Sequence, residues 1–439
     1  MYTTNAQEIF FSAINAVHPR SLMPQHVYID KDVLHICGQK INLSSIDNLI
    51  VIAAGKAAPA MAREIEKQVR HLITKGICIT KYGHALPLNK FNVFEAAHPV
   101  PDKNSILAGE IVLDTVQQLS ANDIVLILLS GGASSLLTDI PQGCTLEDIQ
   151  QLSVLLVNSG ASIEQINIVR KHVSRIKGGQ LAKAAYPAKV FTLTISDVPG
   201  DDPGSIASGP TVPDISTFED AYHVLVKYNI WNQISESVIQ YIRKGLHAEI
   251  EETPKPGSLF FKNTFSEIIG NNKLALEAAK MSASQSGYHV VILNYDLCGD
   301  TEQEARHFVQ YLLDYDGNLP ACIIMGGETT LKVTGNGKGG RNQHFALCAL
   351  HELFKNGITK RNRSITILSA GTDGTDGPTD ATGAIIDTAM IRPGIINFDE
   401  LNNHLADFDA YSFFEKNGGL IITGPTQTNV MDMVIGLIN

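Results

Sequence analysis

A glycine-rich segment that carries two cations is the part of the sequence whose residue types best suit chemistry. Residues 334–343 read TGNGKGGRNQ, with Lys338 and Arg341 among four glycines. Glycine lets the backbone approach a ligand closely, and a lysine and an arginine so near each other can stabilise a phosphoryl group during its transfer. A flexible surface loop is the alternative interpretation. The predicted phosphate-binding residues of this segment are Gly337, Lys338, Gly339 and Gly340.

The same segment matches the GxGxxG pattern of dinucleotide-binding loops at Gly335, Gly337 and Gly340. It follows residues 329–333, which are predicted to form a strand. The pattern alone is weakly specific, and no Asp or Glu lies about 20 residues onward to hold a ribose, as the dinucleotide fingerprint requires. The segment therefore favours phosphate binding over a nicotinamide cofactor.

Two further turns join a predicted strand to a predicted helix. One is Gly55-Lys56 and the other is residues 130–135, SGGASS. A helix N-terminus suits an anion because it offers free N–H groups and a partial positive charge. A lysine at that position opposes the helix dipole, so a phosphate or carboxylate ligand explains Lys56 better than solvent does. The GxxxxGK[ST] spacing of a P-loop is absent.

The second of these turns is also predicted to bind an anion, because its glycines let the backbone close on a ligand and its serines add hydroxyl donors. Helix capping and a tight turn are the alternative explanation. The predicted binding residues of the two turns, besides Lys56, are Gly55, Ser130, Gly131, Gly132, Ser134 and Ser135.

A cluster of basic residues occupies residues 168–179, IVRKHVSRIKGG, in a chain that is acidic overall. Lys171 and Arg175 share a face at helical spacing. The plain interpretation is a solvated helix face. The sharper interpretation is that Arg175 and Lys177 attract an acidic substrate, and both are kept as substrate-binding candidates.

Two glycine-rich loops that follow predicted strands carry acidic residues. Asp373 and Asp376 lie in one loop, and Asp197 and Asp201 lie in the other. Mg²⁺ keeps much of its water in proteins and is held by one or two carboxylates together with phosphates. Asp and Gly also form ordinary turns, so a structural role is an equal alternative. These four aspartates are the predicted metal ligands.

Short apolar runs that end in glycine turns alternate with stretches of helical periodicity along most of the chain. The clearest runs lie at residues 47–54, 123–129, 189–195, 288–293, 321–325 and 364–368. Such an alternation predicts an α/β fold with a parallel sheet covered on both faces. Ligands of these sheets bind at the carboxyl ends of the strands, and the candidate turns lie at those ends.

The length of the chain indicates two domains. With 439 residues, of which 44% are hydrophobic and 18% charged, the chain exceeds one ordinary core. Residues 247–258, HAEIEETPKPGS, are rich in charge and proline and form the best linker candidate. We expect an α/β domain over residues 1–248 and a second one over residues 258–439, with a cleft between them.

Charge and motif content disfavour several classes of protein. The net charge of −11 argues against a binder of nucleic acid or of anionic membranes, and no apolar run reaches the roughly 20 residues of a membrane span. The N-terminal sequence predicts an amphipathic helix rather than a signal peptide. Six scattered cysteines suit a reducing compartment, so we expect a cytoplasmic protein. We find neither an HxxxH or HxH pair with a nearby acid nor a GxSxG elbow.

Several segments together make the chain resemble the glycerate 2-kinase family, and they are spread over nearly its whole length. They are VIAAGKAAPAMA (51–62), LLSGGASSLL (128–137), INIVRKHVSRIKGGQLA (166–182), ISDVPGDDPGSIASGP (195–210), MGGETTLKVTGNGKGGRNQ (325–343), SAGTDGTDGPTDATGAIID (369–387) and TGPTQTNVMDM (423–433). The resemblance implies a Rossmann-like three-layer domain with a mainly parallel sheet, a smaller MOFRL-type α/β domain, and an active site in the cleft between them.

The resemblance also implies transfer of the ATP γ-phosphoryl group to the 2-hydroxyl of D-glycerate, with Mg²⁺. The family's catalytic lysine and arginine correspond by motif to Lys56 and Arg341. Two positions depart from the family pattern: His344, where an acid usually follows GGRNQ, and Gln427, where glycine is common.

Two rival functions remain open. An NAD(P)H-dependent hydroxypyruvate reductase, a label that this family also attracts, would use the Gly335–Gly340 match. A metabolite sensor without catalysis is the other, and Lys56 and Arg341 argue against it. The partners expected are the small molecules D-glycerate and ATP, and a homodimer is one assembly that the sequence allows.

Overall fold

A computed structural model describes residues 2–357, 363–392 and 394–439. The chain forms two compact units, each described here by itself. We call Pro19–Ile269 the parallel-sheet unit, and Met1–His18 with Gly270–Asn439 the mixed-sheet unit. None of the described helices is long and apolar enough to cross a membrane.

The parallel-sheet unit is built on a six-stranded sheet of order β6-β5-β4-β7-β8-β9. From β6 to β8 neighbouring strands pair in parallel, so the carboxyl ends of these strands lie along one edge. Every residue of β4 and β7 is buried, as expected for central strands covered on both faces. The strands are β4 (Leu49–Ala54), β5 (Ile73–Lys81), β6 (Phe91–Ala96), β7 (Ile124–Leu129), β8 (Lys189–Ile195) and β9 (Thr264–Gly270).

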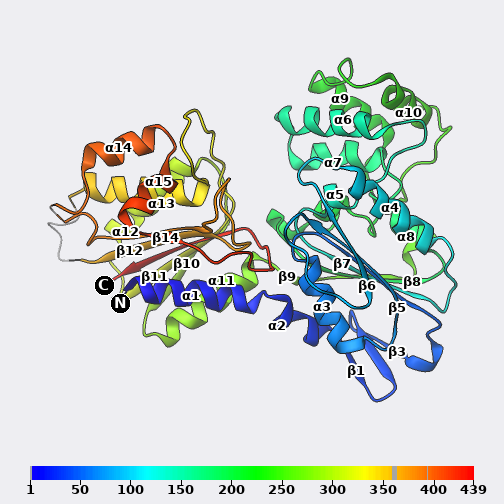
Figure 1. The fold of residues 1–439 in the computed structure, drawn as a ribbon, viewed down its shortest axis with the longest axis horizontal. Helices are drawn as coiled ribbons and strands as arrows, with labels where there is room; N and C mark the ends of the chain where they lie inside the picture. The colour runs from blue at the N-terminus through cyan, green and yellow to red at the C-terminus, as the bar shows by residue number, and fades with distance from the viewer. Residues whose placement is uncertain (1, 358–362, 393) are drawn as a thin grey trace. The chain divides into compact units, whose positions relative to one another are not determined.

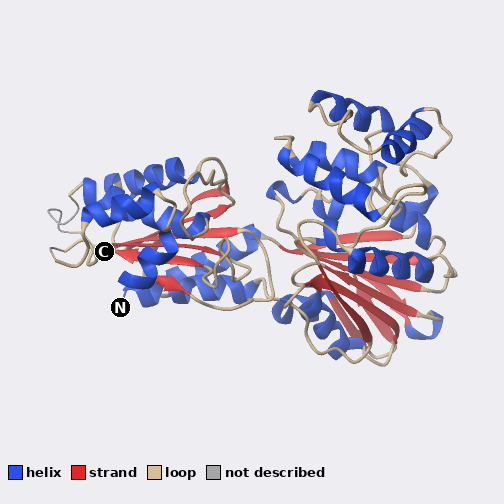
Figure 2. Cartoon of the chain, turned by 45° about the horizontal axis from the view of Figure 1, so that its top comes forward, coloured by secondary structure: helices blue, strands red, loops and turns tan. Residues whose placement is uncertain are grey.

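Helices cover both faces of this sheet (Figures 1 and 2). On one face α4, α5 and α8 pack against alternate residues of β4, β5 and β7 in one apolar cluster. On the other face α3 packs on β4 and β5, beside α2 and an antiparallel three-stranded sheet. These elements are α2 (Pro19–His26), β1 (Val27–Asp30), β2 (Val33–Ile36), β3 (Gln39–Asn42), α3 (Ala58–Val69), α4 (Lys103–Val116), α5 (Ala133–Leu136) and α8 (Gln180–Ala185).

Four more helices form a separate layer of the parallel-sheet unit with an apolar core of their own (Figure 1). Thr145, Ser162 and Thr217 each begin a helix with a capping box, in which side chain and backbone exchange hydrogen bonds. The helices are α6 (Leu146–Asn158), α7 (Ile163–His172), α9 (Phe218–Lys227) and α10 (Glu236–Leu246).

The mixed-sheet unit has a six-stranded sheet of order β10-β11-β15-β12-β13-β14. Strand β15 runs antiparallel between β11 and β12, so its first residue, Asp432, lies opposite the last residues of both, Gly327 and Gly371. The strands are β10 (His289–Leu297), β11 (Ala321–Gly327), β12 (Ile365–Gly371), β13 (Gly383–Asp387), β14 (Leu420–Ile421) and β15 (Asp432–Ile438).

Helices also cover both faces of the mixed sheet (Figure 2). Helices α1 and α11 pack together on one face, and α12 to α15 share an apolar cluster on the other. The helices are α1 (Tyr2–Ala16), α11 (Asn272–Gln285), α12 (Thr301–Asp314), α13 (Arg341–Lys355), α14 (Phe398–Ala406) and α15 (Ala410–Asn417). The predicted α/β class, with a mainly parallel sheet and a second α/β unit, is confirmed.

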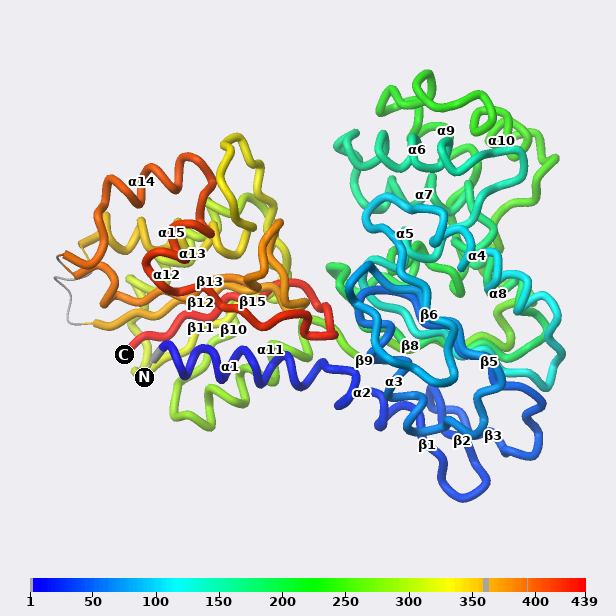
Figure 3. Tube along the Cα trace, in the orientation of Figure 1, coloured from blue at the N-terminus to red at the C-terminus, as the bar shows by residue number. Residues whose placement is uncertain are grey.

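The unit boundaries differ from the expected 1–248 and 258–439. Residues 1–18 belong to the mixed-sheet unit, where α1 lies beside the C-terminal strand β15 (Figure 3). Residues 249–269 stay in the parallel-sheet unit instead of linking two domains. Thr253 Oγ1 donates to Asp214 Oδ2 at 3.0 Å, and Glu252 accepts the amide of Phe218 at 2.8 Å. Charge and proline in this segment therefore serve internal packing.

Candidate active site

The turns that follow β4 and β7 meet at the carboxyl edge of the parallel sheet. The two strands are neighbours, with Ala54 opposite Leu129. The amide of Lys56 donates to Gly131 O at 2.9 Å, and the amide of Ala57 donates to Ser130 Oγ at 3.0 Å. The two turns begin at Gly55 and Ser130, which are 75 residues apart in the sequence, and together they form one surface.

Gly55 is required at this junction for both space and conformation. Its φ is +126°, and a Cβ there would lie 2.3 Å from Ser130 Oγ and 2.5 Å from Ser130 O. Ser130 is buried, and its hydroxyl accepts the amide of Ala57 at the start of α3. This hydrogen bond stabilises the turn. Lys56 stands beside it, half-buried, at the start of the helix.

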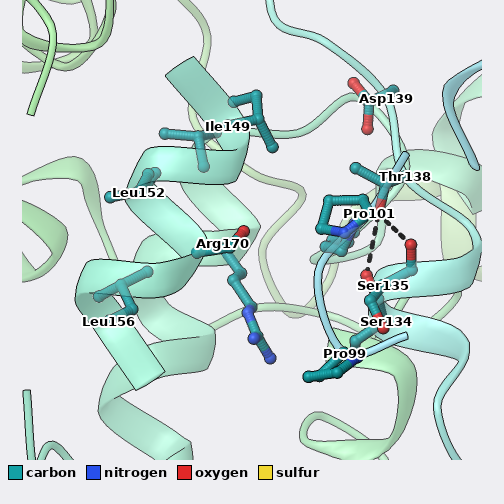
Figure 4. Close-up of a pocket in the computed structure, with 13 residues that line it drawn as sticks. Pro99, Pro101, Ser134, Ser135, Thr138, Asp139, Ile149, Leu152, Leu156 and Arg170 are labelled. Carbon is teal, nitrogen blue, oxygen red and sulfur yellow. Dashed lines mark hydrogen bonds between the residues drawn. The ribbon is translucent and has the colours of Figure 1, made fainter. Parts of the chain in front are cut away.

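A small pocket lies between the segment after β7 and the helical layer of the same unit (Figure 4). Arg170 extends from α7 toward the segments that carry Pro99, Ser134 and Ser135. The walls are apolar on the side of α6, and elsewhere they carry hydroxyls, two cations and the buried carboxylate of Asp139. The lining residues are Pro99, Pro101, Ser134, Ser135, Thr138, Asp139, Ile149, Leu152, Ser153, Leu156, Arg170, Val173 and Lys177.

Lys177 and Arg170 give this pocket a positive charge at neutral pH. Lys177 is 4% exposed, and its ammonium donates to Leu137 O at 3.3 Å and Thr138 Oγ1 at 3.4 Å. Burial, with the nearby Arg170 guanidinium, lowers the pKa of Lys177 to about 8, although Asp139 opposes the shift. Burial also lowers the pKa of Arg170. The charged ammonium of Lys177 and the charged guanidinium of Arg170 are incompletely solvated, and a bound anionic ligand would stabilise both charges.

Arg175 was predicted to bind substrate together with Lys177, but its side chain lies in a different environment. Its side chain is 50% exposed and pairs with Asp139, Nε to Oδ2 at 3.5 Å. It is absent from the described lining of the pocket. The backbone turns after α7 ends at His172, so the helical spacing assumed from the sequence does not reach Arg175.

The loop after β8 packs against the same pocket wall. Ser208 Oγ donates to Asn167 Oδ1 at 2.9 Å and lies 3.0 Å from Ser134 Oγ. Asp201, Ala207 and Ser208 all have positive φ, between 52° and 58°. Non-glycine residues held in this region cost free energy and are concentrated at functional sites. The predicted ligands Asp197 and Asp201 lie at the start of this loop, half-buried.

The mixed-sheet unit has its own charged centre, around Arg341 at the first position of α13. The guanidinium binds the Asp432 carboxylate with two bonds, Nε to Oδ2 at 2.5 Å and Nη2 to Oδ1 at 3.0 Å. Its Nη1 pairs with Glu328 Oε1 at 2.7 Å. Burial disfavours the charged guanidinium, but the Asp432 and Glu328 carboxylates outweigh burial and raise the pKa of Arg341.

Asp376 caps the helix that begins with Arg341. Its carboxylate accepts the amides of Asn342 at 3.1 Å and Gln343 at 2.8 Å, and the side-chain amide of Asn342 at 3.3 Å. Burial raises the pKa of Asp376 to about 6, although these amides oppose the shift. Both oxygens are thus occupied by the protein.

Asp373 lies closer to the strand ends. A Cβ built on Gly371 would lie 3.6 Å from Asp373 Oδ1 and 3.4 Å from Asp432 Oδ1, so both carboxylates face the same space. Asp373 Oδ1 also accepts the amide and the hydroxyl of Thr375. Asp432 gives both of its oxygens to Arg341, so a Mg²⁺ ion near Asp373 would lie beside an existing ion pair.

The glycine-rich loop packs against residues 407–411. The amides of Asn336, Gly337 and Lys338 donate to Asp407 Oδ1, Asp407 O and Asp409 Oδ1, all at 2.9 Å. The ammonium of Lys338 lies 3.9 Å from the ring centroid of Tyr411, a cation–π contact. A phosphate at this loop would therefore meet Gly339, Gly340 and Arg341 rather than the amides before them.

Three residues of these centres were not selected from the sequence: Arg170, Glu328 and Asp432. Arg170 belongs to the basic stretch, and its place seven residues before Lys177 was a usable signal. Asp432 is a single charge inside the apolar run VMDMVIGLI, which is also unusual. For Glu328 we see no signal beyond its position after a predicted strand.

Comparisons with known proteins agree with this architecture. A family model described as "Domain of unknown function (DUF4147)" matches residues 5–243, and a model of the MOFRL family matches residues 321–432. The chain is 44% identical to the D-glycerate 2-kinase of Thermotoga maritima, over 91% of this chain and 92% of that protein. It is 40% identical to an Agrobacterium vitis protein provisionally named a hydroxypyruvate reductase, over 88% of this chain and 86% of that protein.

A solved structure has the same fold. The crystal structure of glycerate kinase from Thermotoga maritima aligns with a TM-score of 0.84 and 40% identity, covering 99% of both chains. A family model over more than half of the sequence, together with relatives matched over most of their own length, establishes the relationship. The chain belongs to the glycerate kinase family.

Proposed function

We propose that this protein is a kinase that transfers the γ-phosphoryl group of ATP to the 2-hydroxyl of D-glycerate and releases 2-phosphoglycerate. The observation that carries the proposal is the pocket of Arg170 and Lys177, in a chain 44% identical to a D-glycerate 2-kinase. Two incompletely solvated cations beside serine hydroxyls suit a small hydroxy acid, whose carboxylate accepts charge-assisted hydrogen bonds.

Lys56 and Arg341 are the proposed catalytic residues. Phosphoryl transfer depends on alignment and on charge stabilisation more than on covalent chemistry by the protein. Lys56, beside the Ser130–Gly132 turn, would bind transferring phosphate oxygens. Arg341 would keep its bond to buried Asp432 and exchange Glu328, whose side chain is 42% exposed, for the phosphoryl group.

Mg²⁺ would supply charge neutralisation of the nucleotide phosphates. Asp373, Asp197 and Asp201 are the proposed ligands. Asp432 faces the same space as Asp373 but gives both of its oxygens to Arg341, so it is not included. Asp376, the fourth aspartate predicted, is less suited because both of its oxygens accept amides of α13.

The test is a turnover assay with D-glycerate, ATP and Mg²⁺ that follows ADP release and identifies the product by NMR. We expect 2-phosphoglycerate. Lys56→Ala should lower kcat by roughly 10³-fold, while the matched control Lys67→Ala, a half-exposed lysine of α3 paired with Glu64, should leave it unchanged. A Lys56→Ala enzyme with a tenth of wild-type turnover would exclude the assigned role.

The same assay separates the rival functions. Consumption of NAD(P)H with hydroxypyruvate, and no ADP, would make the protein a reductase; tight binding of glycerate without either turnover would make it a sensor. We further propose the cytoplasm as its compartment, supported by six free cysteines. A homodimer is kept as a proposal for light scattering to test.

A further inference from the structure

A cluster of three different ligand-type side chains lies between α12 and α13 of the mixed-sheet unit. Glu302 comes from α12, and His344 and Cys348 come from α13. One carboxylate oxygen, one ring nitrogen and the Sγ all lie within 4.8 Å of one another. His344 and Cys348 are four residues apart on one helix, so they share a face one turn apart.

The cluster is almost closed to solvent and is incompletely satisfied. His344 is 1% exposed and Cys348 is 4% exposed, while the Glu302 side chain is 34% exposed. His344 Nε2 lies 3.2 Å from Glu302 Oε1, and its other ring nitrogen, Nδ1, is buried with no hydrogen-bond partner.

The surroundings fix the ring and favour a cation. The His344 ring stacks on Phe408 with centroids 4.9 Å apart and planes 10° apart, which restricts its rotation. Burial raises the pKa of the Cys348 thiol, the carboxylates of Glu302, Asp300 and Glu352 raise it further, and Arg306 opposes the shift. Arg306 pairs with the second oxygen of Glu302, Oε2, at 2.9 Å, which leaves Oε1 on the side of His344.

We propose that Glu302, His344 and Cys348 bind one Zn²⁺ ion that ties α12 to α13, at a site separate from the active site. Imidazole, thiolate and carboxylate are the ligand set of Zn²⁺, whereas Mg²⁺ takes oxygen ligands. The observed N···O separation of 3.2 Å compares with about 3.3 Å between two such ligands of a tetrahedral zinc. On binding, the thiol S–H bond is lost, its proton goes to solvent, and the sulfur bonds to zinc.

The partly exposed Glu302 leaves the fourth position to water. None of the three ligands belongs to the residues assigned to phosphoryl transfer, so the zinc site and the kinase activity are separate proposals. Zn²⁺ that binds the folded chain and not the unfolded one must raise its melting temperature.

The test titrates the metal-free full-length protein with Zn²⁺ alone and then with Co²⁺, a spectroscopic substitute. We expect one Zn²⁺ per chain, a higher melting temperature with Zn²⁺, and a thiolate-to-cobalt charge-transfer band in the near ultraviolet. Cys348→Ala should abolish that band, and His344→Gln and Glu302→Gln should each weaken Zn²⁺ binding at least about tenfold.

Matched controls are Cys322→Ala, a buried cysteine of β11, and His351→Gln, a second histidine of α13. Both should bind Zn²⁺ as wild type does. Because Glu302 is partly exposed, Glu302→Gln is expected to fold even where a core variant fails. The proposal is overturned if wild type shows no thiolate band with Co²⁺, or if Glu302→Gln binds Zn²⁺ with wild-type affinity.

Discussion

At the scale of the residue, Arg341 neutralises Asp432 and is also the proposed catalytic arginine, and experiment can separate the two roles. Its guanidinium neutralises Asp432, which is only 3% exposed. Arg341→Ala should therefore abolish turnover and also cost about 3–5 kcal/mol of stability, because it leaves a buried carboxylate unpaired. The double variant Arg341→Ala/Asp432→Asn should regain most of the stability, measured by denaturant unfolding, and none of the activity.

The outcome that would contradict this prediction is recovery of turnover in the double variant. Turnover that returns with stability would mean that Arg341 acts through folding alone and makes no contact with the transferred group.

We predict that Lys177 gives the enzyme a pH dependence, whose direction follows from the environment of its ammonium group. Its pKa is lowered to about 8, so the ammonium is charged at pH 7 and loses its proton as pH rises through 8. We expect kcat/KM for glycerate to be level up to that pH and then to fall about tenfold per pH unit, since this ratio reports the free enzyme.

Lys177→Arg should remove the alkaline fall by keeping the charge, and Lys177→Met should raise KM by roughly ten- to hundredfold at pH 7. Lys183→Met, which alters a lysine paired with the exposed Glu251, serves as the control. An unchanged alkaline limb in Lys177→Arg would assign the titration to another group.

Sequence reasoning selected Lys56 because a lysine at a helix start is unusual, and Arg341 because it lies with Lys338 among four glycines. It could not find that Asp432 pairs with Arg341, since 91 residues separate them and an antiparallel strand brings them together. It also looked for histidine pairs, so the His344–Cys348 pair on one helix face went unnoticed. The proposed roles of the glycine loop and of the four aspartates still await experiment.

At the scale of the element, we predict different roles for two aspartates of one loop: Asp376 caps helix α13, and Asp373 binds the metal ion. Asp376→Ala removes the acceptors of the first α13 amides and should lower stability by about 2 kcal/mol. Asp373→Asn keeps an acceptor for Thr375 and should leave the melting temperature unchanged, but raise the Mg²⁺ concentration for half-maximal activity roughly tenfold. A lower melting temperature in Asp373→Asn would reject this division.

The glycine-rich loop is predicted to depend on close packing as well as on any ligand. A Cβ on Gly337 would lie 2.4 Å from Asp409 Cβ and 2.5 Å from Asp407 O, so Gly337→Ala must displace the loop from residues 407–411. We expect a lower melting temperature and faster proteolysis at this loop. Asn336 has an exposed side chain and contacts Asp407 through its backbone amide, so Asn336→Ala should behave as wild type.

The elements themselves were largely predictable because their patterns are local. The strand expected at residues 189–195 coincides with β8, and the run at residues 123–129 forms β7, which begins one residue later. Pairing order was not predictable, since it depends on contacts between distant segments. That is why the antiparallel position of β15 within the second sheet appeared only in the structure.

At the scale of the whole molecule, the N-terminal helix α1 belongs to the mixed-sheet unit, which also contains the C-terminal strand β15. Its amphipathic pattern was visible in the sequence, but the surface that it covers was not. Helix α1 packs on α11, β12 and β15, and Thr428 Oγ1 donates to Val17 O at 2.8 Å. The apolar side chains that it buries are Ala6, Ile9, Phe10, Ala13, Ile14 and Val17.

Deleting residues 1–18 should therefore unfold the mixed-sheet unit and spare the parallel-sheet unit. Each large apolar side chain buried by α1 contributes about 1.5–3 kcal/mol, so losing several exceeds much of the stability of a typical domain. Limited proteolysis with mass spectrometry should then recover a protected fragment near residues 19–269. A chain of residues 1–18 joined by a flexible linker to residues 270–439 should fold by itself. If residues 270–439 melt at the same temperature with and without this segment, α1 is an accessory and the unit boundary moves to residue 270.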